Sequence, residues 1–204
     1  FTADGREYVG QFLISGAGAL HIPSIPEIDG RDEFTGPAFH SAQWDHSVDL
    51  TGKKVAIVGT GASAIQIVPE IVGQVAELQL YQRTPAWVVP RSNPELPVEL
   101  RRAMENIPGL RPLVRLGIYW AQEALAIGMT KRPNMLRFIE AYAKYNIRRS
   151  IKDRELRRKL TPHYRIGCKR ILNSSTYYGA VADPKTQLIT EGISRITRDG
   201  IVTA

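Results

Sequence analysis

The sequence has only one cysteine, Cys168, among its 204 residues. A disulfide within the chain is therefore excluded, and this cysteine usage predicts a reducing, cytoplasmic setting. The sequence also lacks an apolar run of the ~20 residues that a membrane-spanning helix needs, because the longest candidate is interrupted by Arg111, Arg115 and Glu123. No basic-then-apolar leader is recognisable, so we expect neither a secretory signal nor a membrane span.

Metal-binding and hydrolase patterns are absent as well. The histidines His21, His46 and His163 show no ligand spacing with one another or with Cys168, so we expect no metal site. No Ser/His/Asp arrangement of a hydrolase is recognisable, and neither is the Tyr-x-x-x-Lys pair of a plain NADP dehydrogenase. These absences disfavour a metalloenzyme, a triad hydrolase and a plain dehydrogenase.

Positive charge is concentrated in one stretch of the chain. The formal net charge is +7, yet residues 148–170 alone carry ten Lys and Arg against Asp153 and Glu155. One interpretation is a solvated helix face with a few anion-binding residues, and the other is a nucleic-acid surface. We favour the first and expect no nucleic-acid partner, because no aromatic interleaving or nucleic-acid motif accompanies the charge.

The middle of the chain predicts a βαβ unit. Residues 53–58 are typical of a buried strand in a parallel sheet, residues 62–73 of a helix, and residues 75–81 of a second strand. Pro69 removes a helical hydrogen bond, so we expect a kink or a short helix there. The crossover that joins the two strands should be right-handed.

A helical pattern runs from about residue 94 to residue 160, which we interpret as an insertion after the second strand. Apolar residues recur there at spacings of three and four, as on one face of a helix. The first set is Leu113, Leu116, Trp120, Ala124 and Ile127, and a second set is Phe138, Tyr142 and Tyr145.

Turn dipeptides lie near both ends of the chain. Asp4 and Gly5 predict a β-hairpin within residues 1–20, with Phe12–Ser15 as one of its strands. Residues 187–202 likewise predict short strands, with a turn at Asp199 and Gly200. Paired hairpins at the two ends suit a domain that is inserted into a larger one.

The segment Gly59-Thr60-Gly61-Ala62-Ser63-Ala64 has the G-x-G-x-x-A spacing of a dinucleotide-binding turn. The first glycine permits the tight turn, the second lets the backbone approach a pyrophosphate, and the alanine keeps the helix close to the strand. A purely structural glycine turn is the alternative, but the position between strand and helix favours nucleotide binding. The candidate cofactor-binding residues of this segment are Gly59, Thr60, Gly61, Ser63, Ala64 and, one turn further, Gln66.

The end of the second strand carries Gln82, Arg83 and Thr84, where NAD-binding proteins place an acidic residue. A guanidinium attracts the 2′-phosphate of NADPH and can bind it in bidentate fashion, whereas an acid would repel it. Arg83 therefore favours NADPH over NADH, with Thr84 beside it. The alternative is an arginine that forms a salt bridge with a neighbouring residue.

Upstream of the glycine turn, Phe34, Gly36, His40, Trp44 and Asp45 form a spaced string. On residue chemistry alone, His40 is a packing histidine between aromatic residues. The string resembles the F-x-G-x-x-x-H-x-x-x-W-(P/D) fingerprint of Baeyer–Villiger monooxygenases, flavin enzymes that insert oxygen beside a ketone carbonyl.

Two further segments fit this resemblance. Gln82-Arg83-Thr84-Pro85 looks like the Q-R-T-P segment of the family, and Lys169-Arg170-Ile171 looks like its K-R-(I/L) segment. The resemblance implies that Arg83 and Lys169 meet the 2′-phosphate of NADPH. It also implies that Arg170 is catalytic and lies over the flavin, where a permanent cation stabilises the negatively charged peroxyflavin.

The resemblance implies an α/β fold: a Rossmann-like NADP-binding domain with a helical insertion, plus β-linker remnants of an FAD-binding domain. We expect residues 1–50 to be the tail of the FAD-binding domain and a linker, and residues 51–186 to bind NADP. Residues 187–204 should form a β-linker that returns to the FAD-binding domain. The glycine fingerprint for FAD is absent, so the chain should be an internal piece of a longer enzyme whose FAD domain is its partner.

The implied enzyme uses NADPH, FAD and O₂ to insert one oxygen next to a ketone or to oxidise a soft heteroatom. The chain alone should bind NADPH weakly and have no monooxygenase turnover. One alternative is a flavin-containing monooxygenase that oxygenates N or S, against which Trp44 and Asp45 argue. A second alternative is a non-catalytic module that binds nucleotides or nucleic acid, and it depends on the basic stretch alone.

Overall fold

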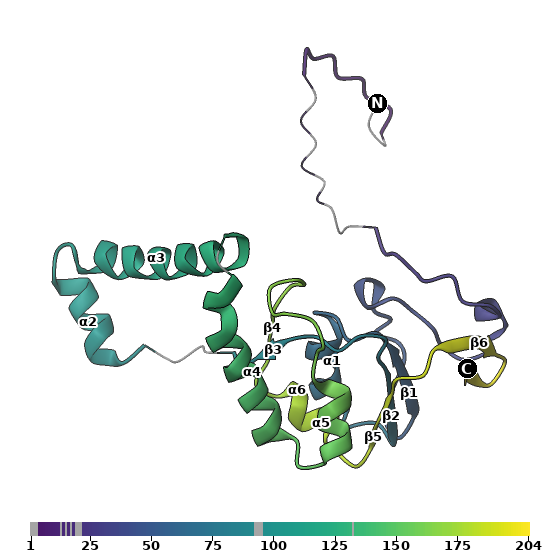
Figure 1. Ribbon diagram of the computed structural model, residues 1–204. Coiled ribbons are helices and arrows are strands. Elements are labelled where there is room, and N and C mark those ends of the chain that lie inside the picture. Colours follow the sequence, from purple (N-terminus) through teal and green to yellow (C-terminus); the bar gives the residue numbers. More distant parts are fainter. Residues whose placement is uncertain are drawn as a thin grey trace. The chain divides into compact units, whose positions relative to one another are not determined.

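The computed structural model describes residues 4–12, 14, 16, 18, 22–91, 96–131 and 133–204. The chain divides into two compact units. The first unit combines residues 1–48 with residues 193–202, and the second combines residues 49–192 with residues 203–204. The second unit holds the parallel sheet and most of the helices (Figure 1).

The sheet of the second unit has three parallel strands (Figure 1). They are β1 (Lys54–Val58), β2 (Glu77–Tyr81) and β5 (Thr186–Ile189), in the order β1-β2-β5. Val58 at the end of β1 is opposite Tyr81, which in turn is opposite Ile189. The predicted α/β class with a parallel sheet is confirmed, and all three strands end at the same edge.

Strand β1 is less buried than its sequence predicts. Val55 and Ile57 are only half-buried, and Val58 is 50% exposed. Among the described residues β1 pairs with β2 alone, so it is an edge strand and not the buried strand that we expected. Leu78 and Leu80 in the central strand β2 are fully buried, because that strand has neighbours on both sides.

Helix α1 (Ala64–Ile71) connects β1 to β2 and contains Pro69. It is shorter than the predicted range of residues 62–73, which agrees with the short helix expected from the missing proline N–H. Ile65, Val68 and Ile71 are buried in the main core, as the spacing of one helix face requires.

The helical pattern of the middle region is confirmed. The elements are α2 (Val98–Asn106), α3 (Leu110–Thr130), the 3-10 helix η3 (Pro133–Leu136), α4 (Arg137–Ser150) and α5 (Arg154–Leu160). The apolar stripe on α3 is largely exposed, with Leu113 at 63% and Trp120 at 62%, and Phe138 on α4 is 84% exposed. Periodicity thus predicted the helices correctly, while these faces do not contribute to the core of the unit.

Two short parallel strands and one helix complete the second unit. Val88–Val89 (β3) pairs with Leu172–Asn173 (β4), and α6 (Tyr177–Val181) contacts α1, α4 and β5. The main core joins the sheet to α1, α4, α5 and α6. A second cluster surrounds Trp87, which is 1% exposed and packs near Leu136 and Ile166.

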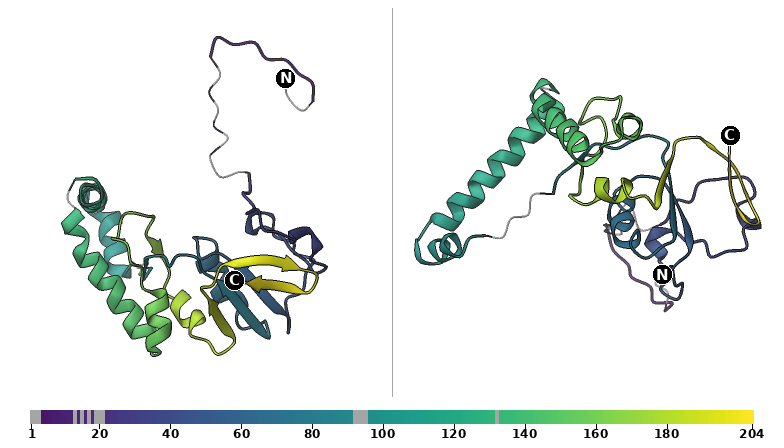
Figure 2. Two further views of the ribbon diagram at one scale, coloured as in Figure 1. Left: turned by 45° about the vertical axis from the view of Figure 1, so that its right-hand side comes forward. Right: turned by 90° about the horizontal axis from the view of Figure 1, so that it is seen from below.

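The first unit contains two 3-10 helices, η1 (Arg31–Glu33) and η2 (Ser41–Gln43), and most of the hairpin of β6 (Ile193–Thr197) and β7 (Gly200–Thr203). Figure 2 shows this hairpin in yellow near the C-terminus. It turns at residues 198 and 199, one residue before the predicted position. The Ile196 N–H donates to the Asp29 carbonyl over 2.7 Å, so two distant segments are joined.

The hairpin predicted for residues 1–20 is not observed. The described residues from 4 to 18 form no strand, while Leu13 and Ser15 of the predicted strand lie outside the described part of the chain. A β-strand needs a hydrogen-bonded neighbour, and a lone two-stranded hairpin is only marginally stable. The sheets that the described residues form include no residue of this segment.

Candidate nucleotide-binding site

The glycine turn after β1 has open backbone donors. Gly59 has a φ of 106°, which only glycine adopts readily. A Cβ atom on Gly61 would meet no atom within 4 Å, so there is room for a group to approach the backbone. The N–H groups of residues 61–63 donate to no protein group among the described residues. Free donors before a helix attract an anion such as a pyrophosphate.

The other predicted residues of this turn differ in their surroundings. Ala64 is 7% exposed at the first position of α1, so its small side chain fits where the helix starts. Ser63 is exposed and makes no capping hydrogen bond. Gln66 is also exposed, and its Nε2 donates to the Ala62 carbonyl over 2.8 Å. The Ser63 hydroxyl is therefore available to a ligand, whereas Gln66 is partly engaged.

The segment after β2 is fixed by four hydrogen bonds. The Gly59 N–H donates to the Tyr81 carbonyl over 2.9 Å, and the Gln82 N–H donates to the Ile189 carbonyl over 2.8 Å. The Gln82 side chain, only 4% exposed, donates through Nε2 to the Lys159 carbonyl over 2.9 Å. The Thr60 hydroxyl donates to the Thr84 carbonyl over 3.3 Å, which ties this segment to the glycine turn.

Arg83 itself is exposed and forms no ion pair or hydrogen bond among the described residues. The alternative of a salt bridge to a neighbouring residue is therefore not observed. The unpaired guanidinium thus belongs to a backbone segment that is hydrogen-bonded to the glycine turn. This is the arrangement that recognition of a phosphate requires, because a guanidinium can form two parallel hydrogen bonds to its oxygens.

The loop between α5 and β4 brings the second predicted cation to the same region. The Lys169 ammonium lies 4.9 Å from the centre of the Tyr164 ring. The Tyr164 hydroxyl donates to the Pro85 carbonyl over 3.0 Å, so this ring also contacts the segment that carries Arg83. Sequence reasoning missed Tyr164, because nothing local distinguishes it from a packing tyrosine.

Arg170, next to Lys169, is exposed and unpaired among the described residues. Lys169 is likewise exposed and has no carboxylate partner there. Burial raises the pKa of the Tyr164 hydroxyl above its ordinary value, which keeps it protonated as a donor near neutral pH. The structure thus connects the glycine turn, Arg83 and Lys169 through Thr60, Thr84 and Tyr164.

The upstream fingerprint lies in the first unit and forms a self-contained turn. A Cβ atom on Gly36 would lie 2.7 Å from the Phe34 ring, so a side chain there would require that ring to move. The His40 Nδ1 accepts from the Ala42 N–H over 3.1 Å and caps η2. Trp44 packs edge-on against Phe39, with 5.1 Å between ring centres.

Asp45 closes this turn. Its Oδ1 accepts from the Ser47 hydroxyl over 2.6 Å and from the Ser47 N–H over 2.9 Å. These hydrogen bonds lower the pKa of the Asp45 carboxyl below its ordinary value. The aspartate is thus ionised at neutral pH, and each residue of the string has a local structural function.

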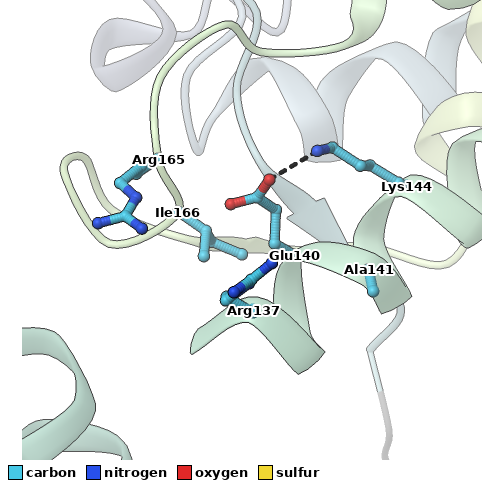
Figure 3. A pocket seen from close by; sticks show the side chains of 6 residues that line it. All are labelled: Arg137, Glu140, Ala141, Lys144, Arg165 and Ile166. Carbon is cyan, nitrogen blue, oxygen red and sulfur yellow. Dashed lines mark hydrogen bonds and ion pairs between the residues drawn. The ribbon is translucent and has the colours of Figure 1, made fainter. Parts of the chain in front are cut away.

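Two hollows lie elsewhere in the second unit, and neither is lined by the predicted cofactor-binding residues. The first has a volume of about 530 Å³ and lies between α4 and the loop at Arg165 (Figure 3). Its carboxylate, Glu140, accepts a hydrogen bond from Lys144 over 2.6 Å.

The second hollow, of about 400 Å³, lies between α4 and α5 and is strongly basic. Four arginines that line it form no ion pair among the described residues. They are Arg148, Arg154, Arg157 and Arg158. Part of the basic stretch therefore converges on one groove.

The described ranges contain neither a membrane-spanning helix nor a cluster of metal ligands. Within them, none of the helices combines the length and the apolarity needed to cross a bilayer. In the same residues, no three side chains of His, Cys, Asp or Glu gather as metal ligands would.

The chain is similar to known flavin enzymes. Residues 9–100 match the family model described as flavin-binding monooxygenase-like. Over 98% of its length the chain is 47% identical to a Baeyer–Villiger monooxygenase of Pseudomonas aeruginosa, of which it covers 38%. It is 48% identical over 94% of its length to a Baeyer–Villiger monooxygenase of Streptomyces coelicolor, of which it covers 37%.

A solved structure gives the same result. The crystal structure of OTEMO in complex with FAD and NADP matches 95% of this chain and 44% of its own, with a TM-score of 0.75 and 27% identity. The chain spans well under half the length of the relatives that it matches. The resemblance to Baeyer–Villiger and other flavin-binding monooxygenases, which the motifs predicted, is therefore confirmed.

Proposed function

We propose that this chain supplies the NADPH-binding part of an FAD-dependent Baeyer–Villiger monooxygenase. The observation that carries the proposal is the set of contacts joining the three predicted segments. Thr60 hydrogen-bonds to Thr84, and Tyr164 contacts both Pro85 and Lys169. Residues that are distant in sequence thus form one continuous arrangement of backbone donors and unpaired cations, which suits a phosphorylated dinucleotide.

In this proposal the N–H groups of residues 61–63 bind the pyrophosphate of NADPH, where the free donors favour negative charge. Arg83 and Lys169 bind the 2′-phosphate, since neither cation has an acidic partner among the described residues. Thr84 and the Ser63 hydroxyl complete the contacts. We further propose that residues 51–186 form a Rossmann-like NADP-binding domain with a helical insertion from about residue 94 to residue 160.

The remaining segments belong, in this proposal, to the connection with an FAD-binding domain of the same protein. These are residues 1–50, with the fingerprint from Phe34 to Asp45, and residues 187–204. When bound, FAD reduced by NADPH supplies the chemistry with O₂ that delivers an oxygen atom to a ketone. Arg170 would stabilise, through its permanent positive charge, the negative charge that develops on the bound flavin. The chain alone would then lack turnover, and the intact enzyme would act in the cytoplasm.

The cofactor part of this proposal is tested by Arg83→Ala. We expect the variant to bind NADPH about 10- to 100-fold more weakly, the loss typical of a hydrogen-bonded charge, while its affinity for NADH stays unchanged. Titration of both nucleotides by calorimetry measures this. Arg101→Ala on α2, another exposed arginine, is the matched control and should bind NADPH like the wild type. Equal affinity of the wild type for the two nucleotides would contradict the proposal.

A second candidate is a flavin-containing monooxygenase that acts on N or S. Trp44 and Asp45 of the fingerprint favour the ketone reaction, and two of the curated relatives that match nearly the whole chain are named Baeyer–Villiger monooxygenases. Assays of the intact enzyme on a cyclic ketone and on a thioether or tertiary amine separate the two reactions. Oxygenation confined to the heteroatom compounds would favour the second candidate.

A further inference from the structure

Tyr164 has contacts at both ends of its side chain. The hydroxyl donates to the Pro85 carbonyl over 3.0 Å, and the ring face lies 4.9 Å from the Lys169 ammonium. Pro85 follows Arg83 and Thr84 directly in sequence, whereas Tyr164 is 79 residues away from Pro85. One side chain therefore bridges the two segments that carry the predicted phosphate-binding cations.

The backbone of Tyr164 is held as firmly as its side chain. The Trp87 indole donates through Nε1 to the Tyr164 carbonyl over 2.9 Å, and the two rings pack edge-on with 6.4 Å between their centres. Trp87 is only 1% exposed, so it is a fixed part of the second core cluster. Tyr164 is thus held in place by a buried residue of the core, and it has little freedom to move with the loop.

Lys169 needs such a support because its own position is otherwise unconstrained. It is exposed, it has no acidic partner among the described residues, and it lies in the loop that precedes β4. Immobilising a flexible lysine side chain when a ligand binds costs conformational entropy. An aromatic face attracts the ammonium and restricts it before the ligand arrives.

We propose that Tyr164 is a positioning residue for nucleotide specificity: it holds the Lys169 ammonium next to the Arg83 segment, so that both cations meet one phosphate. This inference deepens the proposed function and rests on it. The expected consequence is selective. Loss of Tyr164 weakens binding of the nucleotide that carries a 2′-phosphate and leaves binding of the nucleotide without one unchanged.

The experiment measures dissociation constants for NADPH and NADH in four proteins: the wild type, Tyr164→Leu, Tyr164→Phe and Tyr145→Leu. Tyr164→Leu removes both contacts, and we expect NADPH to bind about five- to tenfold more weakly. Tyr164→Phe keeps the ring, and we expect about a twofold loss. Tyr145, which is 58% exposed on α4, is the matched control and should change neither constant.

A double-mutant cycle separates positioning from a general structural effect. In the Lys169→Gln background, Tyr164→Leu should cause no further loss of NADPH affinity, because the residue that Tyr164 positions is gone. The same additional loss in both backgrounds would overturn the inference. So would equal weakening of NADPH and NADH by Tyr164→Leu, which is the result of a purely structural function.

The outcomes also separate this inference from the proposed function. A wild type that binds NADPH and NADH equally would remove the proposed function, and the inference with it. A wild-type preference for NADPH that Arg83→Ala abolishes and Tyr164→Leu preserves would overturn only the inference. The Phe variant keeps the test decisive if the Leu variant fails to fold, since it removes one hydroxyl from a retained ring.

Discussion

Individual glycines show why the same residue type has different functions along this chain. Gly59, in the turn after β1, has a positive φ, and a Cβ atom there would meet no neighbour. Gly30 in the first unit also has a positive φ, of 73°, but a Cβ atom there would collide with the Ile196 carbonyl oxygen. Backbone geometry alone requires glycine at the first site, whereas geometry and close approach both require it at the second.

Gly30→Ala should therefore lower the free energy of unfolding more than an alanine substitution at a glycine with a similar φ and open space around it. Gly52, with a φ of 67° and no atom within 4 Å of a Cβ, is such a site. We expect Gly52→Ala to lower the free energy of unfolding by about 1–2 kcal/mol, because of the left-handed backbone alone. Hydrogen exchange of the Ile196 amide should become faster only in Gly30→Ala. Denaturant unfolding and hydrogen exchange measure the two effects. Unchanged exchange at Ile196 in Gly30→Ala would contradict the collision.

At the scale of elements, capping and charge pairs stabilise the helices that support the candidate site. Asp153 is the N-cap residue of α5, and its Oδ1 accepts from the Leu156 N–H over 2.6 Å. The other end of α5 offers the Lys159 carbonyl that accepts from Gln82. A short helix thus fixes the residue before Arg83, so the stability of α5 affects the site directly.

On α4, Glu140 and Lys144 are one turn apart and 2.6 Å from each other. The hydrogen bond from Lys144 holds the pKa of the Glu140 carboxyl below its ordinary value of 4.5. Because the folded-state pKa is lowered, the stabilisation is present above the unfolded-state value and is lost as the pH falls through the folded-state value. The contribution is small, since the pair is partly exposed.

Glu140→Gln should lower the free energy of unfolding by ~0.5 kcal/mol at neutral pH, the size of a helical ion pair. The difference from the wild type should shrink as the pH falls below 4.5 and the wild-type carboxylate becomes protonated. Urea unfolding of both proteins across the acidic range measures it. Lys144→Gln removes the same pair, so its difference from the wild type should also shrink toward low pH, although it removes the ammonium 5.7 Å from the Trp87 ring centre as well. A difference that grows toward low pH would refute the assigned sign.

At the scale of the whole molecule, the surface charge requires an explanation of its own. The four unpaired arginines of the groove between α4 and α5 concentrate positive charge outside the candidate site. They suit an anion, and they are the observation that favours the nucleic-acid alternative. A groove of this kind on a solvated helix pair is also ordinary, because arginine side chains are well hydrated when exposed.

We expect the protein not to bind random duplex DNA at physiological salt. A nucleic-acid surface made of these arginines would give an affinity that falls steeply with salt, with a log–log slope of about −4 for four phosphate contacts. Fluorescence anisotropy at several salt concentrations measures this. A slope of that size in the wild type, reduced to about −2 in Arg157→Gln/Arg158→Gln because two of the four contacts are gone, would support the nucleic-acid alternative.

The sequence by itself determined the local features, because these depend on residues close together along the chain. The glycine spacing from Gly59 to Ala64 required a turn before a helix, and the apolar periods required the helices from Val98 to Leu160. The fingerprint could be read in the same way, since its contacts in the first unit are almost all local.

Only the tertiary structure decided which features are buried and which distant residues meet. It made β1 an edge strand and left the predicted apolar stripes of α3 and α4 exposed, whereas Ala143 and Ile147 of α4 are buried. Burial depends on the neighbouring elements, which the periodicity of one helix does not specify. It also brought Tyr164 to Pro85 across 79 residues and Gln82 to Lys159 across 77. The first contact joins the loop before β4 to the segment after β2, the second joins α5 to that segment, and no local sequence pattern encodes either.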